Sequence, residues 1–119
     1  MVKIAIPGAA GRMGQELVRT CQATDGVETG AASEHSESNA IGRDSGEVAG
    51  VDANEVFISR SLDPECFDVL VDFTRPQPAM QHLALCLQEN KAMVIGTTGF
   101  SAEEKDSIAA AAKQIPIVF

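Results

Sequence analysis

The sequence predicts an α/β protein with a doubly wound, mostly parallel sheet of about six strands and helices on both faces. Two observations carry this prediction. Short apolar runs of strand length alternate with longer amphipathic stretches along the chain. The first such pair, Lys3–Ile6 and about Arg12–Ala23, is joined directly by a glycine-rich turn. A strand, a tight glycine turn and a helix, in that order, are typical of the unit that begins a nucleotide-binding sheet.

The turn contains three glycines, Gly8, Gly11 and Gly14, at three-residue spacing. Gly8 allows a tight turn off the strand without a Cβ penalty. The helix that follows would point free N–H groups and its positive dipole end at a pyrophosphate. Gly14 would let that helix lie close against the first strand. The strict pattern would place glycines at positions 8, 10 and 13, so this is a variant. A loop that merely packs a βα unit remains the alternative, but the context favours a Rossmann-type dinucleotide site.

A carboxylate follows the second predicted strand, Val27–Ala32. Glu34 lies about 20 residues after Gly14, where a dinucleotide fold places the acid that binds the adenosine ribose hydroxyls. Such an acid repels a 2′-phosphate and therefore favours NAD over NADP. Its neighbour, His35, offers only a weak, pH-dependent positive charge. The alternative is that Glu34 is an ordinary solvated loop acid.

The remaining elements follow in the same alternation. Ser36–Glu55 is polar and predicts a long surface loop with room for one short helical turn, a type of loop that is usually functional or mobile. The elements after it are a short third strand (Val56–Ser59), a turn or short helix (Leu62–Phe67), a buried fourth strand (Asp68–Phe73), a proline-initiated helix to about Glu89, a fifth strand (Ala92–Ile95), a helix from the capping box at Ser101 to about Lys113, and a sixth strand (Ile115–Phe119). Pro116 predicts that the last strand lies at an edge.

The proline-initiated helix is expected to face inward with Met80, Leu83, Ala84 and Leu87. His82, beside this stripe, is interpreted as a partly exposed helix residue rather than a catalytic one. We expect the nucleotide to lie across the carboxyl ends of the first, second, fourth and fifth strands.

Composition limits the classes of partner. The whole chain, residues 1–119, is expected to be one domain. Its net charge of −8 argues against nucleic acid and anionic membrane surfaces as partners. No apolar run has the length of a membrane span. The three cysteines are widely spaced and indicate buried thiols in a reducing cytoplasm, and the two histidines lie too far apart to suggest a zinc site.

Three motifs occur together in the order that one family shows. They are Gly8–Gly14 (GAAGRMG), Asp72–Pro76 (DFTRP) and Val94–Phe100 (VIGTTGF). Together they closely resemble the N-terminal half of bacterial 4-hydroxy-tetrahydrodipicolinate reductase, also called dihydrodipicolinate reductase, and the resemblance covers essentially the whole chain. The resemblance implies hydride transfer from NADH or NADPH to a cyclic imine, or its dehydrated form, in diaminopimelate and lysine biosynthesis.

The same resemblance implies a set of cofactor-binding residues. Those for the pyrophosphate are Gly8, Ala9, Ala10, Gly11, Arg12 and Met13, with Arg12 also towards the adenosine. Glu34 would bind the adenine ribose, with His35 beside it, and the nicotinamide end would be lined by Phe73, Gly96, Thr97 and Thr98. Dual-specificity members have arginine where this chain has His35, so NADH is the expected preference and NADPH the second cofactor.

The resemblance also implies that residues 1–119 are the cofactor-binding half of a larger enzyme. The family continues with a segment that completes the cofactor site and with a domain that binds substrate, supplies the proton donor and forms tetramers. No catalytic residue is therefore expected here, and these residues alone should be inactive and monomeric or weakly associated. Two alternatives remain, the cofactor domain of another amino-acid-pathway dehydrogenase and a stand-alone NAD(H)-sensing module. A CoA or flavin binder fits Glu34 less well.

Overall fold

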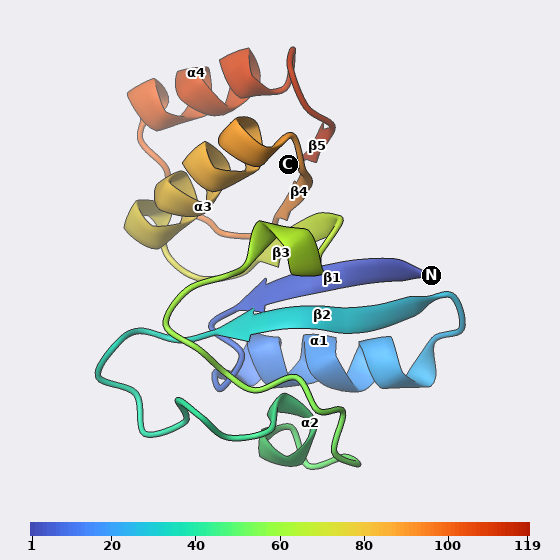
Figure 1. Cartoon of the computed structure of the whole chain (residues 1–119). Coiled ribbons are helices and arrows are strands. Elements are labelled where there is room, and N and C mark those ends of the chain that lie inside the picture. The colour runs from blue at the N-terminus through green and yellow to red at the C-terminus, as the bar shows by residue number, and fades with distance from the viewer.

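Five parallel strands form a single sheet in the order β2-β1-β3-β4-β5 in the computed structural model, which describes residues 1–119 (Figure 1). The elements are β1 (Val2–Pro7), α1 (Arg12–Ala23), β2 (Val27–Ser33), α2 (Ser45–Val48), the 3₁₀ helix η1 (Pro64–Cys66), β3 (Val69–Asp72), α3 (Pro76–Glu89), β4 (Ala92–Ile95), α4 (Ala102–Ala111) and β5 (Ile117–Val118). The predicted fold class is confirmed.

Side-chain alternation along the strands separates two apolar cores, one on each face of the sheet. Successive strand residues point to opposite faces. Ala5 accordingly belongs to the core under α3 and α4, and its neighbour Ile6 belongs to the core under α1. Ala31 and Ala32 in β2 divide in the same way. Figure 1 shows α1 covering one side of the sheet and α3 and α4 the other.

The segment Val56–Ser59, predicted as a third strand, makes only two isolated bridges, Ser33 with Ser59 and Asp44 with Phe57. The reason is that its backbone groups are shared between two neighbours. The Ser59 N–H donates to the Ala32 carbonyl at 3.0 Å, whereas Val56 accepts from the Ser45 N–H at 2.9 Å. The segment therefore pairs briefly with the loop before α2 and then with the end of β2, and it does not form a full strand of the sheet.

The predicted inward stripe of α3 needs one correction. The buried residues are Ala79, Leu83 and Cys86, whereas Ala84 is exposed. This spacing of four and three residues defines one face, and Ala84 lies beside that face rather than on it. The stripe holds α3 against the carboxyl end of the sheet. The helix begins with prolines in its first turn, as predicted.

The C-terminal part confirms the edge position of the last strand, although β5 is shorter than predicted. The capping box before α4 is present, with Ser101 and Glu104 bonded reciprocally. All three cysteines are free; Cys21 and Cys86 are buried and Cys66 is half-buried. None of the helices has both the length and the apolar character needed to cross a bilayer.

Candidate functional site

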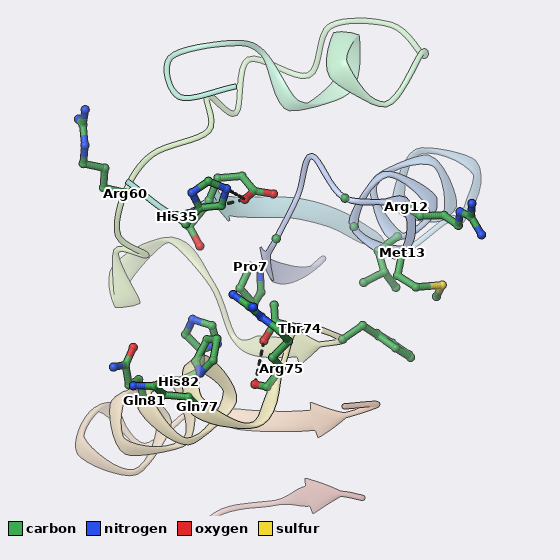
Figure 2. A pocket seen from close by; sticks show the side chains of 18 residues that line it. Pro7, Arg12, Met13, His35, Arg60, Thr74, Arg75, Gln77, Gln81 and His82 are labelled. Atoms are coloured by element: carbon green, nitrogen blue, oxygen red, sulfur yellow. Dashed lines mark hydrogen bonds and ion pairs between the residues drawn. The ribbon is translucent and has the colours of Figure 1, made fainter. Parts of the chain in front are cut away.

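A cavity of about 700 Å³ opens at the carboxyl edge of the sheet (Figure 2). Its walls are the glycine turn with the start of α1, the end of β2 with the nearby Arg60, the segment after β3, and the first two turns of α3. Open α/β sheets bind ligands at this edge, where the loops after the strands diverge. The volume lies in the ordinary range for a cofactor site.

The glycine turn presents an open helix end to the cavity. Gly11 is the N-cap of α1 and has no side chain to cap it. The N–H groups of Arg12, Met13 and Gly14 belong to the first helical turn, and they find no acceptor in the chain. With the positive end of the helix dipole, these groups form a site suited to an anion.

Backbone conformation explains the glycine at position 8, and close packing explains the glycine at position 14. Gly8 has φ of +68°, a conformation that favours glycine. A Cβ on Gly14 would lie 2.1 Å from the Gly8 carbonyl oxygen, so α1 can approach the turn only without a side chain there. Gly14 is buried, as the sequence predicted, and it fixes where the open helix end points.

Glu34 fastens the end of β2 to the glycine turn. Its Oε2 accepts a hydrogen bond from the Ala10 N–H at 2.9 Å, and its Oε1 accepts from the His35 N–H at 3.2 Å. The side chain is only 10% exposed, yet it borders the cavity. The carboxylate therefore has a structural role in shaping the turn and can still offer remaining lone pairs to a ribose hydroxyl.

The structure brings together most of the predicted pyrophosphate and ribose residues. The predicted residues that line the cavity are Gly8, Gly11, Arg12, Met13, Glu34, His35 and Phe73. Those that do not line it are Ala9, Ala10, Gly96, Thr97 and Thr98. Ala9 is fully buried, and Ala10 contributes its N–H to Glu34. Thr98 is exposed and is not part of the cavity wall.

Two of the residues predicted at the nicotinamide end are committed to contacts within the protein. The Thr97 side chain is buried, donates to the Asp72 carboxylate at 2.9 Å and does not line the cavity. Gly96 packs on the Phe73 ring, and a Cβ there would lie 2.1 Å from the nearest ring carbon. Gly96 therefore lets Phe73 lie flat against the end of β4, with the ring 39% exposed.

Asp72, at the end of β3, organises the segments after two strands and is itself fully buried. Its Oδ1 accepts from the Thr74 N–H at 2.8 Å, the Thr74 hydroxyl at 2.6 Å and the Thr97 hydroxyl. Its Oδ2 pairs with His82 Nδ1 at 2.5 Å. Burial on its own would raise the pKa of this carboxyl, but the hydrogen bonds from His82 and Thr74 outweigh burial and hold the pKa below its ordinary value.

Sequence reasoning missed this network and several cavity residues. His82 is partly exposed as expected, but it also borders the cavity and its ring is oriented by Asp72. Gln77 and Gln81 line the same wall, one helical turn apart. In the sequence they were indistinguishable from an ordinary solvated helix face. Arg60 and Arg75 also border the cavity. Arg75 lies within the Asp72–Pro76 motif, but neither arginine was predicted to bind the cofactor.

The residues present fit a dinucleotide. An anion can bind at the open end of α1, a ribose can bind at Glu34, and an adenine base fits between the end of β2 and the polar face of α3. Phe73 and Met13 also border the cavity. No group of three or more metal-ligating side chains occurs in the chain.

Comparison with known proteins agrees with this geometry. Residues 2–119 match the family model described as dihydrodipicolinate reductase, N-terminus. The structure is similar to dipicolinate-bound dihydrodipicolinate reductase from Paenisporosarcina sp. TG-14, with 32% identity, a TM-score of 0.65, and coverage of 94% of this chain and 43% of that one.

More distant structures share the fold alone. Amine dehydrogenase from Mycobacterium smegmatis is 20% identical with a TM-score of 0.70, over 94% of this chain and 36% of that one. Aspartate semialdehyde dehydrogenase from Candida albicans is 14% identical with a TM-score of 0.66, over 99% and 42%. The chain thus spans less than half the length of each of these three structures.

Proposed function

The chain belongs to the dihydrodipicolinate reductase family, and from this premise we propose that it binds the nicotinamide dinucleotide of a reductase acting on a dihydrodipicolinate-class substrate. The observation that carries the proposal is the open N-terminus of α1 behind Gly11, which borders the same cavity as Glu34. Membership of this oxidoreductase family and the cofactor-binding fold are established by the comparisons. The substrate and a role in lysine biosynthesis are proposed.

The geometry supports one orientation of the cofactor. Its pyrophosphate would accept hydrogen bonds from the free N–H groups at the start of α1, where no side chain intervenes. Its adenosine ribose would contact Glu34, and its adenine would lie towards Gln81 and His82. The nicotinamide would then lie towards Phe73 and Gly96, at the ends of β3 and β4.

Each of these residues binds or positions a part of the cofactor, and none transfers a proton. The bound cofactor supplies hydride, and the protein fixes where the hydride-bearing ring lies. The Asp72 network holds the segments after β3 and β4 in register, which positions Phe73 against Gly96. Substrate groups and the proton donor are proposed to come from the remainder of the protein, since the chain spans 43% of the reductase that it matches.

A substitution at the helix N-cap tests the proposal. Gly11 has φ of −76° and ψ of 174°, which aspartate adopts readily at an N-cap. Gly11→Asp would place a carboxylate where the pyrophosphate is proposed to bind. Its Cβ would lie 3.3 Å from the Gly8 carbonyl oxygen, a close contact whose cost thermal unfolding measures. Ala102→Asp is the matched control, because it adds the same charge at the start of α4, away from the cavity.

The measurement is calorimetric titration of NADH into the three proteins, alongside thermal unfolding. We expect the parent chain and Ala102→Asp to bind alike, and Gly11→Asp to lose roughly 100-fold or more in affinity while remaining folded, because an anion and a carboxylate compete for one site. Unchanged affinity in Gly11→Asp, or no NADH binding by the parent chain, would contradict the proposal.

A further inference from the structure

The cavity is positively charged in an otherwise acidic protein. The chain has 17 acidic and 9 basic residues and a net charge of −8. The cavity wall nevertheless contains Arg12, Arg60, Arg75 and both histidines, and Glu34 is the one acid in it. Clefts lined by one sign of charge focus the field and favour ligands of the opposite sign. This wall therefore favours an anionic ligand.

The one acid in the wall is already engaged. Both oxygens of Glu34 accept backbone hydrogen bonds, from Ala10 and His35, and the side chain is 10% exposed. The ring Nε2 of His35 lies 3.9 Å from Glu34 Oε1. The hydrogen bonds from the Ala10 and His35 N–H groups partly offset the carboxylate charge. Glu34 consequently repels a nearby phosphate less than its position in the sequence suggests.

Arg60 is fixed at this same end of the cavity by the residues on either side of it. Ser59 forms a parallel bridge with Ser33, its N–H donates to the Ala32 carbonyl, and its carbonyl accepts from the Glu34 N–H at 3.0 Å. The Ser59 hydroxyl donates to the Ser61 carbonyl at 2.6 Å, which closes a turn around Arg60. The backbone of Arg60 is therefore held directly beside the backbone of Glu34.

The Arg60 side chain itself is exposed and makes no hydrogen bond or ion pair within the chain. Figure 2 shows Arg60 and His35 on the same side of the cavity, with the Arg60 side chain extended outward, and Arg12 and Met13 on the other side. A planar guanidinium that is fixed at its backbone but has no partner is suited to bidentate binding of a phosphate. Glu34 marks this end as the ribose end, so a phosphate here would be attached to the adenosine ribose.

We propose that Arg60, with His35 beside it, forms a subsite for the ribose 2′-phosphate, so that this cavity binds NADPH at least as well as NADH. The inference rests on the proposed function, because it assumes that the cavity binds a nicotinamide dinucleotide. It reverses the preference for NADH over NADPH that the sequence predicts. That prediction considered His35 as the single cation beside Glu34. Arg60 is far from Glu34 in the sequence and reaches the site only through the bridge between Ser33 and Ser59.

Calorimetric titration of the 119-residue chain with NADH and NADPH tests the subsite. Adenosine 2′,5′-bisphosphate and adenosine 5′-monophosphate are added as probes that differ only in the 2′-phosphate. Arg60→Ala should weaken NADPH and the bisphosphate by roughly 10- to 100-fold, as expected for loss of a charge-assisted bidentate contact, and leave NADH within about twofold. Arg43→Ala is the matched control, since Arg43 is also an exposed arginine but does not border the cavity.

The outcomes separate the two proposals. Binding of NADH together with NADPH at least tenfold weaker would overturn the 2′-phosphate subsite and leave the proposed function intact. Equal losses for NADH and NADPH in Arg60→Ala, or equal losses in Arg43→Ala and Arg60→Ala, would also overturn it. Binding of neither dinucleotide would overturn both proposals. A preference for NADPH that falls as salt rises from about 50 mM to about 500 mM supports the subsite, since exposed charges are screened in this range.

Discussion

Two carboxylates stand at the carboxyl ends of two strands that flank β1, and they are used differently. Glu34, after β2, borders the cavity and accepts hydrogen bonds from the backbone N–H groups of Ala10, in the glycine turn, and of His35. Asp72, at the end of β3, is fully buried and accepts hydrogen bonds mainly from side chains on the segments after β3 and β4 and on α3. The first shapes a surface that a ligand can reach, and the second joins three segments where no ligand reaches.

The difference shows that position at a strand end does not by itself decide the role of an acid. Both residues follow an apolar strand, as dinucleotide-fold acids do. Glu34 and Asp72 differ in the segments that pack against them. Asp72 faces α3, whose His82 approaches from above the strand end, whereas Glu34 faces the glycine turn and solvent. Three predictions test this contrast.

The largest expected effect is loss of stability on removing the buried carboxylate. Asp72→Ala would leave the Thr74 and Thr97 hydroxyls and His82 without their acceptor in a buried site. Each buried donor left without an acceptor typically costs about 1–3 kcal/mol of unfolding free energy. Urea unfolding followed by circular dichroism measures the change, and the exposed Asp106→Ala on α4 serves as control. A loss below about 1 kcal/mol, as for a surface residue, would show that the network is unimportant.

Removing the Glu34 carboxylate should reduce stability less than removing that of Asp72. It should reduce the affinity for the cofactor more. Glu34→Ala removes the acceptor for the Ala10 N–H and a ribose contact. We expect the unfolding free energy to fall by about 1 kcal/mol and the affinity for NADH to fall roughly tenfold. Calorimetry and urea unfolding measure both quantities. Glu37→Ala, an exposed acid outside the cavity wall, is the control. Equal destabilisation by Glu34→Ala and Asp72→Ala, with binding unchanged, would remove the contrast.

The smallest expected effect is a pH dependence of stability to which Asp72 contributes. Its folded-state pKa is lowered, since hydrogen bonds from His82 and Thr74 outweigh burial. A lowered pKa means that the carboxyl adds stability above its unfolded pKa of about 3.9 and loses it as pH falls through the lower folded value. Asp44 behaves in the same direction, because N–H groups of Glu47, Asn54 and Glu55 outweigh its burial.

Unfolding midpoints measured in steps between about pH 5 and about pH 2 should therefore fall for the parent chain. Asp72→Asn keeps the shape of the side chain but cannot titrate, so its midpoint should fall less steeply over this interval. Asp44 should contribute to the fall of the unfolding midpoint that remains in Asp72→Asn. Parallel curves for the parent and Asp72→Asn would show that Asp72 does not contribute to the acid sensitivity.

The fold and half of the site followed from the sequence because their signals are local. The glycine turn, the strand before it and the helix after it are contiguous, and Glu34 lies at a spacing that one βαβ unit fixes. The buried Gly14 and the capping box at Ser101 also depend on neighbours within a few residues. Strand 56–59 was the local prediction that the structure changed, because its hydrogen-bonding partners lie on two separate segments.

The tertiary structure alone decided which distant residues meet. Asp72, His82 and Thr97 are brought together because β3 and β4 are adjacent and α3 packs across their ends. Arg60 reaches Glu34 through a single bridge between Ser33 and Ser59. Hydrophobic periodicity and turn chemistry determine an element from its own residues. Polar networks and the charge of a cavity depend on the three-dimensional order of the strands, which no stretch of this sequence contains by itself.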